Sequence, residues 1–172
     1  MSAPGTPSFP AAAERRAPLA PWWLAARVLG AVAILAVGAV HLQQYHKLYS
    51  QVPTIGTLFV LNFIGATVLS VGLLVPFDRL SRRWGPLVVA ALALGGIALA
   101  AVSYVFLLIA ERRPLFGFME PGYNPGAIRF SQVSEIATVV LLGVYLVARH
   151  VPFKSPNQRP AIESDSPQEV RT

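Results

Sequence analysis

Apolar residues occur in four long blocks separated by short polar segments. The blocks cover about residues 22–42, 55–75, 87–110 and 132–149 and hold almost no charged side chains. A helix of about 20 apolar residues is long enough to cross the hydrocarbon layer of a bilayer. The pattern therefore predicts an all-α fold, a bundle of four transmembrane helices that forms one domain over residues 22–150.

Prolines and glycines mark several of the expected helix ends. Pro53 lies at the start of the second helix, and Gly85-Pro86 precede the third. The uncharged part of the fourth helix runs only from Ile136 to Ala148, and it reaches bilayer length when extended back to about Gln132. Small residues such as Gly38 and Gly96 predict close contacts between helices, because helices in lipid associate through close backbone approach.

The two ends of the chain have a different composition from the blocks. Residues 1–21 and 151–172 are rich in Pro, Ser and charged residues, and we expect both to be disordered tails. A cleaved signal peptide is the alternative for the N-terminus, because Arg15-Arg16 precede an apolar run. The run to Leu42 is longer than the usual signal-peptide core of about 7–15 residues, which favours a retained first helix.

The distribution of Lys and Arg predicts the orientation of the bundle. Most of these residues lie in the two tails and in the segment between the second and third helices, so both termini are expected in the cytoplasm. Arg27 lies one turn inside the first helix, and we expect its side chain to extend back to the head groups. The excess of Ala, Gly, Pro and Arg suits a bacterial genome rich in G and C, so we expect the four spans to lie in the plasma membrane. The basic residues on the opposite side are Lys47, Arg112, Arg113 and Arg129.

Charge and cysteine content narrow the expected partners. The net charge is +6, but the basic residues lie where helices would leave a bilayer, which favours lipid head groups over nucleic acid as their partner. Cysteine is absent, which excludes disulfides and thiolate metal sites. The lipid bilayer is the expected partner, and contact with another membrane protein or a second copy of the chain stays open.

Three polar residues form the candidate site. In the predicted orientation, His41, Glu120 and Glu135 all lie at the extracytoplasmic end of the bundle. Imidazole and carboxylate ligands suit Zn²⁺ or another divalent ion, so these three residues are the candidate metal ligands. The same groups would also suit proton transfer or a polar head group, including that of a quinone. The alternatives are that His41 marks the membrane interface and that Glu135 either forms an ion pair with Arg129 or another arginine or is exposed because the helix starts later.

Polar residues also occur within the spans and beside the candidate site. Asn62 and Ser103 lie inside the second and third helices, and we expect them to form hydrogen bonds between helices. Residues 114–130 form a long segment rich in aromatic residues, expected to lie in the head-group layer or to cover the His41 region as a lid. Pro121, Gly122, Pro125 and Gly126 in this segment predict turns.

The four-span layout resembles a known superfamily. Arg27-Val-Leu-Gly30 open the first helix and His41 closes it before Tyr45, an arrangement similar to the DoxX-like superfamily. These are small four-helix bacterial membrane proteins, some of them tied to quinone-linked redox complexes. Residues 53–59 and 115–120 look more like uncharacterised actinobacterial membrane proteins. The resemblance implies the fold and assigns no catalytic residue and no cofactor.

The sequence holds no phosphate-binding loop, no nucleophile triad and no facing histidine pair for haem. We therefore expect a non-enzymatic accessory or envelope-associated bundle. The alternative is a redox-accessory protein that binds a metal or a quinone at the extracytoplasmic end. An oligomeric small-molecule transporter is a weaker alternative, because four helices leave little room for a pathway.

Overall fold

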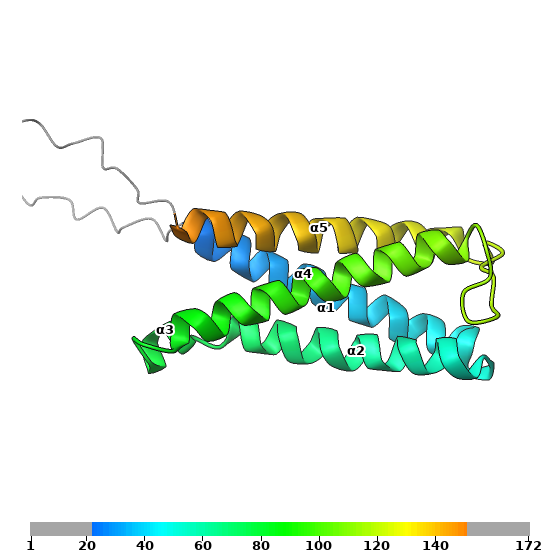
Figure 1. Cartoon of the computed structure of the whole chain (residues 1–172), viewed down its shortest axis with the longest axis horizontal. Coiled ribbons are helices and arrows are strands. Elements are labelled where there is room, and N and C mark those ends of the chain that lie inside the picture. The colour runs from blue at the N-terminus through cyan, green and yellow to red at the C-terminus, as the bar shows by residue number, and fades with distance from the viewer. Residues whose placement is uncertain (1–21, 151–172) are drawn as a thin grey trace, which may run out of the picture.

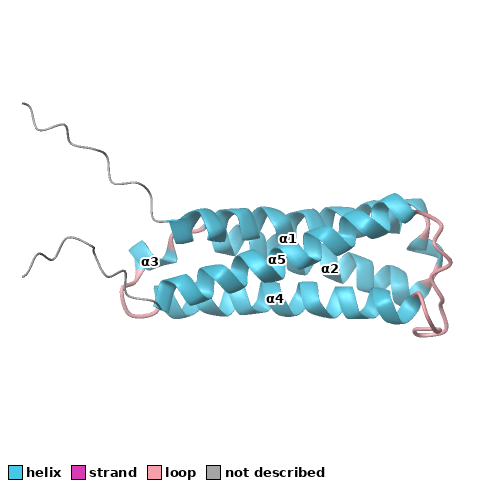
Figure 2. Ribbon diagram, turned by 90° about the horizontal axis from the view of Figure 1, so that it is seen from above, coloured by secondary structure: helices cyan, strands magenta, loops and turns pink. Residues whose placement is uncertain are grey.

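The computed structural model describes residues 22–150, and the predicted tails, 1–21 and 151–172, lie outside the described residues. Four long helices run lengthwise beside one another (Figures 1 and 2), which confirms the predicted all-α four-helix architecture. The elements in chain order are α1 (Trp22–Lys47), the 3-10 helix η1 (Tyr49–Gln51), α2 (Pro53–Leu74), α3 (Phe77–Leu80), α4 (Gly85–Ala110) and α5 (Pro125–His150).

The bundle has two distinct ends. At the α3 end, α1 begins, α5 ends, and α3 connects α2 to α4 (Figure 1). At the loop end, η1 connects α1 to α2, and residues 111–124 connect α4 to α5. The candidate residues His41, Glu120 and Glu135 all belong to the half of the bundle nearer the loop end.

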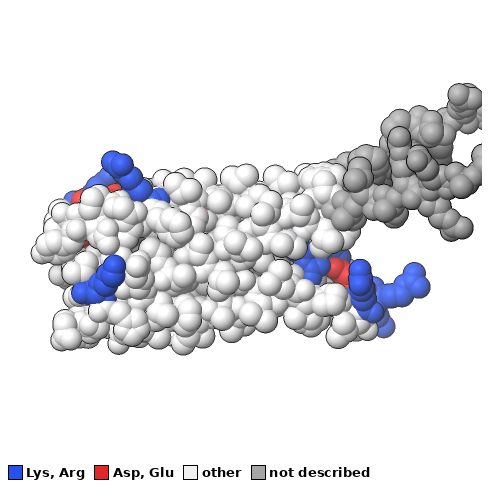
Figure 3. Space-filling model, turned by 180° about the vertical axis from the view of Figure 1, so that it is seen from behind, with Lys and Arg blue, Asp and Glu red and all other residues white. Residues whose placement is uncertain are grey.

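The outer surface of the bundle is hydrophobic along its length. Large apolar side chains are exposed on every long helix, for example Leu29, Val68, Leu94 and Val133. Lys, Arg, Asp and Glu lie at the two ends in Figure 3 and leave an uncharged band between them. The four long helices are each long and apolar enough to cross a membrane. A surface of this kind is unfavourable in water and matches a lipid environment, in which helices satisfy their own backbone hydrogen bonds.

Glycines let the helices approach one another closely. A Cβ atom added to Gly38 of α1 would lie 2.8 Å from the Cβ of Ala66 in α2. Cβ atoms added to Gly30 and Gly96 would lie 2.5 and 2.8 Å from the side chain of Leu142, which is fully buried between them. The predicted role of these small residues in helix packing is therefore supported by contacts that involve all four long helices.

The last long helix differs from the sequence-based prediction. It begins at Pro125 rather than near Gln132, so the predicted turn at Pro125 and Gly126 is wrong. Asn124 caps the helix: the backbone N–H of Ala127 donates to its Oδ1 at 3.2 Å, and proline is favoured in the first turn. As a result, Glu135 lies about three turns inside α5 rather than near its start. In the same way, α1 continues past Leu42 to Lys47, through Gln residues that favour helix.

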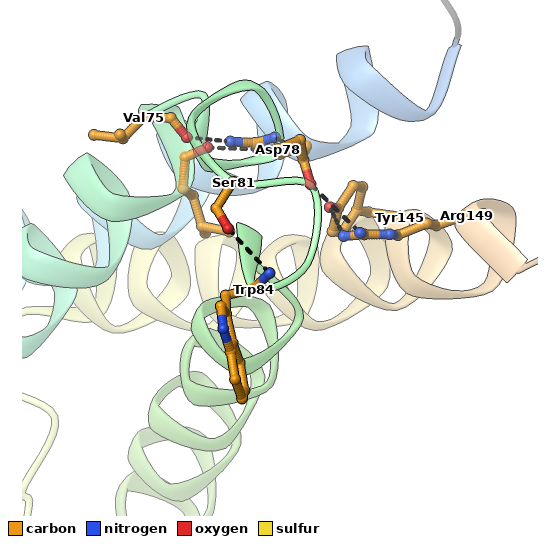
Figure 4. A network of polar contacts seen from close by, with 8 residues as sticks. Val75, Asp78, Ser81, Trp84, Tyr145 and Arg149 are labelled. Carbon is orange, nitrogen blue, oxygen red and sulfur yellow. Dashed lines mark hydrogen bonds and ion pairs between the residues drawn. The ribbon is translucent and has the colours of Figure 1, made fainter. Parts of the chain in front are cut away.

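The predicted extension of Arg27 to the head groups is also wrong. Arg27 is only 4% exposed, and its Nε and Nη2 donate to the carbonyl oxygens of Leu73 and Val75 at 2.5 and 2.6 Å. Its Nη1 lies 3.0 Å from Oδ2 of Asp78, and Arg149 of α5 lies 3.4 Å from Oδ1 of the same carboxylate. Figure 4 shows this polar network around Asp78. These contacts hold the α3 end together, because they connect α1, the end of α2, α3 and α5.

Candidate functional site

A cavity of about 250 Å³ lies between the four long helices in the half of the bundle nearer the loop end. Its walls are largely apolar, with Leu58, Leu99 and Phe106 among the lining residues. The helices α2 and α4 lie close together near α3 and separate toward the loop end in Figure 1. Leu61 of α2 and Val102 of α4 both line the cavity and are at least half exposed. The cavity therefore opens sideways, through the apolar surface between α2 and α4.

The three residues predicted from the sequence all line this cavity. His41 comes from α1, Glu120 from the loop after α4, and Glu135 from α5. Within residues 22–150, however, no group of three or more His, Asp or Glu side chains is arranged to hold a metal ion. The metal-binding interpretation of His41, Glu120 and Glu135 therefore stays a prediction.

His41 presents a hydrogen-bond acceptor. Its Nδ1 lies 2.8 Å from the carbonyl oxygen of Val37, one turn earlier in α1. A carbonyl oxygen only accepts, so Nδ1 carries the proton and Nε2 is the acceptor in the neutral ring. The ring packs edge-on against Phe59 of α2, with 4.9 Å between the ring centroids. The orientation of His41 is thus fixed by both α1 and α2.

Glu135 is the most buried acidic residue of the described chain, with 1% of its surface exposed. Its Oε1 accepts a hydrogen bond from the Ser131 hydroxyl at 3.0 Å, and its buried Oε2 has no hydrogen-bond partner. The ion pair with Arg129 that the sequence left open is not formed, because both ion pairs within residues 22–150 involve Asp78 at the opposite end. Burying a carboxyl group inside a bundle of apolar helices costs free energy unless the group faces a partner or a cavity.

Two amide side chains that the sequence did not identify as site residues complete the polar lining. Gln44 is 7% exposed, and neither its Nε2 nor its Oε1 has a partner. It lies three residues after His41, a spacing that places both on one face of α1. Asn62 donates through Nδ2 to the Ser103 hydroxyl, which confirms the expected bond between helices, but its buried Oδ1 has no partner.

These unpartnered atoms belong to Gln44, Asn62 and Glu135, and all three residues line the cavity. A buried polar group without a hydrogen bond destabilises a protein by about 1–3 kcal/mol. Native structures rarely keep several such groups around one space unless something satisfies them. Because they gather in one cavity, this cavity is the candidate binding site.

Both carboxylate oxygens of Glu120 accept hydrogen bonds. Its Oε2 accepts a hydrogen bond from the Tyr49 hydroxyl, and its Oε1 accepts one from the N–H of Gly122 at 2.9 Å. Its own N–H donates to the carbonyl oxygen of Ala110 at 2.9 Å. Burial, and then the hydrogen bond to Glu120, raises the pKa of the Tyr49 hydroxyl well above its usual range. Glu120 thus connects the loop, η1 and the end of α4.

The loop covers the loop end of the cavity. Leu115, Phe118 and Glu120 all contribute to the cavity lining. The ring of Phe118 packs edge-on against Tyr49, with 5.5 Å between centroids, and Tyr49 packs against Phe59 at 4.9 Å. These residues line the same cavity as His41, which is the arrangement expected of a lid.

No protein-family model matches this chain, and no match was found among curated proteins or solved structures. The resemblance to the DoxX-like superfamily therefore stays a prediction.

Proposed function

We propose that this chain is a multi-pass protein of the plasma membrane that binds one small lipid-soluble molecule with a polar head group. Both termini lie in the cytoplasm, so the cavity lies at the extracytoplasmic side of the bilayer. The protein acts without chemistry of its own, as an accessory protein that holds or presents its ligand. A quinone is one member of this ligand class.

One observation carries the proposal: an apolar cavity with a sideways opening contains the unpartnered polar atoms of Gln44, Asn62 and Glu135. A ligand site typically combines apolar walls with a few polar groups that orient the ligand. The exposed side chains of Leu61 and Val102 at the opening would contact lipid tails. A lipid-soluble molecule would therefore pass from the bilayer into the cavity without crossing water.

The size of the cavity limits the part of the ligand that it encloses. A protein cavity of about 150 Å³ holds benzene, so about 250 Å³ accommodates a group of roughly ten non-hydrogen atoms. A longer apolar tail would extend through the opening between α2 and α4. The cavity occupies only the half of the bundle nearer the loop end, and for this reason we favour binding over transport.

Extraction of co-purified molecules tests the proposal. The protein is purified in lipid nanodiscs, extracted with organic solvent and analysed by mass spectrometry. Ala127→Phe fills the cavity, because Ala127 lines it, whereas Ala137→Phe changes a similarly half-buried residue of α5 outside the lining. We expect a molecule other than bulk lipid, near one per chain, in the wild type and in Ala137→Phe, and its loss in Ala127→Phe. Equal recovery from all three proteins, or recovery of bulk lipid alone, would contradict the proposal.

The proposed orientation is tested with single cysteines, because the chain has none of its own. Ser50→Cys places a thiol at the exposed loop end, and Arg82→Cys places one at the exposed α3 end. A membrane-impermeant maleimide should label Ser50→Cys in intact cells and Arg82→Cys only after lysis. The reverse pattern would overturn the orientation, and extraction of the protein by carbonate without detergent would overturn membrane insertion.

A further inference from the structure

We infer that the head group of the ligand is a protonated amine attached to a small hydrophobic body. The inference rests on the proposed function and specifies its ligand. It follows from three features of the cavity: the charges of its lining, the balance of its unpartnered hydrogen-bonding atoms, and the aromatic rings around its polar end.

The ionisable lining contains two carboxyl groups and no Lys or Arg side chain to balance them. The titratable residues that line the cavity are His41 of α1, Tyr49 of η1, Glu120 of the loop and Glu135 of α5. The lining residues from α2 and α4 include no titratable group, and no Lys or Arg lines the cavity. An anionic ligand would be repelled here, and a cationic ligand would supply the missing positive charge.

The unpartnered atoms are mostly acceptors. Oε1 of Gln44, Oδ1 of Asn62 and Oε2 of Glu135 lack partners, and Nε2 of Gln44 is the single unpartnered donor group among the buried side chains of residues 22–150. Nε2 of His41 adds another acceptor, since Nδ1 donates to a carbonyl oxygen. A quinone presents only carbonyl acceptors and would leave most of these atoms unsatisfied. A primary ammonium group presents three donors and matches them.

Aromatic rings surround the same part of the cavity. Phe59 packs against both His41 and Tyr49, with 4.9 Å between centroids in each case, and Phe118 packs against Tyr49. All four residues line the cavity. The face of an aromatic ring attracts a cation, and this attraction increases when water is excluded. Rings, acceptors and carboxyl groups together recognise an organic cation better than a neutral or anionic head group.

The test compares two probes of equal shape, 4-phenylbutylamine and uncharged 4-phenyl-1-butanol. Both have eleven non-hydrogen atoms, close to the capacity of the cavity. Binding to protein in nanodiscs is measured by isothermal titration calorimetry, with empty nanodiscs subtracted to remove partition into lipid. We expect the amine to bind about tenfold or more tightly than the alcohol, because hydrogen bonds from a charged donor are roughly twice as strong as neutral ones.

Two variants assign the preference to the cavity. Glu135→Gln keeps the size of the side chain and removes its charge, and we expect it to abolish the preference for the amine over the alcohol. Glu111→Gln removes a carboxylate at the end of α4 that does not line the cavity, and we expect it to keep the preference. A preference that survives in Glu135→Gln would overturn the inference.

The outcomes separate this inference from the proposed function. Equal or tighter binding of the alcohol in the wild-type protein refutes the amine and leaves a neutral ligand site in place. Binding of neither probe, together with no co-purified molecule, refutes both the inference and the proposed function. The comparison of the two probes in the wild-type protein does not depend on whether Glu135→Gln folds, so the inference can be refuted even without that variant.

Discussion

Replacement of Arg27 by methionine is expected to destabilise the α3 end strongly. Arg27 makes three hydrogen bonds, to the carbonyl oxygens of Leu73 and Val75 and to the carboxylate of Asp78. Hydrogen bonds to charged groups contribute about 1.5–3 kcal/mol each, which sets an upper limit of about 9 kcal/mol. Asp78 is 32% exposed and keeps Arg149 as a partner, so part of its interaction is screened and replaced. We therefore expect a loss of about 3 kcal/mol in the free energy of unfolding.

The free energy of unfolding is measured in mixed micelles by titration with a denaturing detergent, followed by circular dichroism. Arg27→Lys should lie between the wild type and Arg27→Met, because one ammonium group does not reproduce the planar fork that reaches three acceptors. Arg79→Met is the matched control: Arg79 is exposed on α3, and a substitution there should change stability by less than about 0.5 kcal/mol. An Arg27→Met protein as stable as the control would refute the reasoning.

Three further predictions follow from the packing and the loop. In the same assay, Gly38→Ala should lower the free energy of unfolding by about 1–3 kcal/mol, because the added methyl group clashes with α2. Gly143→Ala should raise the free energy of unfolding by about 0.5–1 kcal/mol, because no atom beyond the adjacent residues and backbone of its own helix lies within 4 Å of the added Cβ and alanine favours helix over glycine. Asn124→Ala should remove the cap of α5, lower stability by about 1 kcal/mol and speed amide hydrogen exchange in the first turn, which unchanged exchange would contradict. Because the pKa of Tyr49 is raised in the folded protein, folding favours the protonated hydroxyl, and stability is lost as the pH rises above about 10, where the unfolded state ionises. Tyr49→Phe should show a smaller loss of stability over that range, and equal slopes would contradict the assignment.

The hydrophobic pattern was sufficient to predict the number and approximate positions of the long helices. It misplaced the start of α5 because the absence of charge was used as the criterion for the helix. The residues before the apolar block include Ser131, Ser134 and Glu135, which are buried in the bundle and not at a membrane surface. Asn124 followed by Pro125 is a helix-start signal, and the capping rules applied to this pair would have placed the boundary correctly.

The contacts that define the site were harder to predict. The sequence placed His41, Glu120 and Glu135 at one end of the bundle, and all three line one cavity. It did not identify Gln44, because a glutamine near the end of an apolar helix carries no signal for missing hydrogen bonds. Nor did it distinguish Glu120, which is bonded on both oxygens, from Glu135, which has one free. Those differences depend on the distance and rotation between helices, which a single sequence does not contain.

The two ends of the bundle differ in how closely α2 and α4 pack, and the proposed binding site lies at the more open end. Near α3, Cβ atoms added to Gly72 and Gly95 would lie 3.0 Å from leucines of the facing helix, so α2 and α4 are in direct contact there. Asn62 of α2 and Ser103 of α4, which share a hydrogen bond, both line the cavity. Toward the loop end the two helices separate (Figure 1). In water, the hydrophobic effect would tend to close an apolar opening of this kind. In a bilayer, lipid tails can fill the opening, because the hydrophobic effect contributes little to helix association there. Since Tyr49 and Glu120 hold the loop across the remaining end, exchange of a ligand would pass sideways through the lipid rather than through the lid.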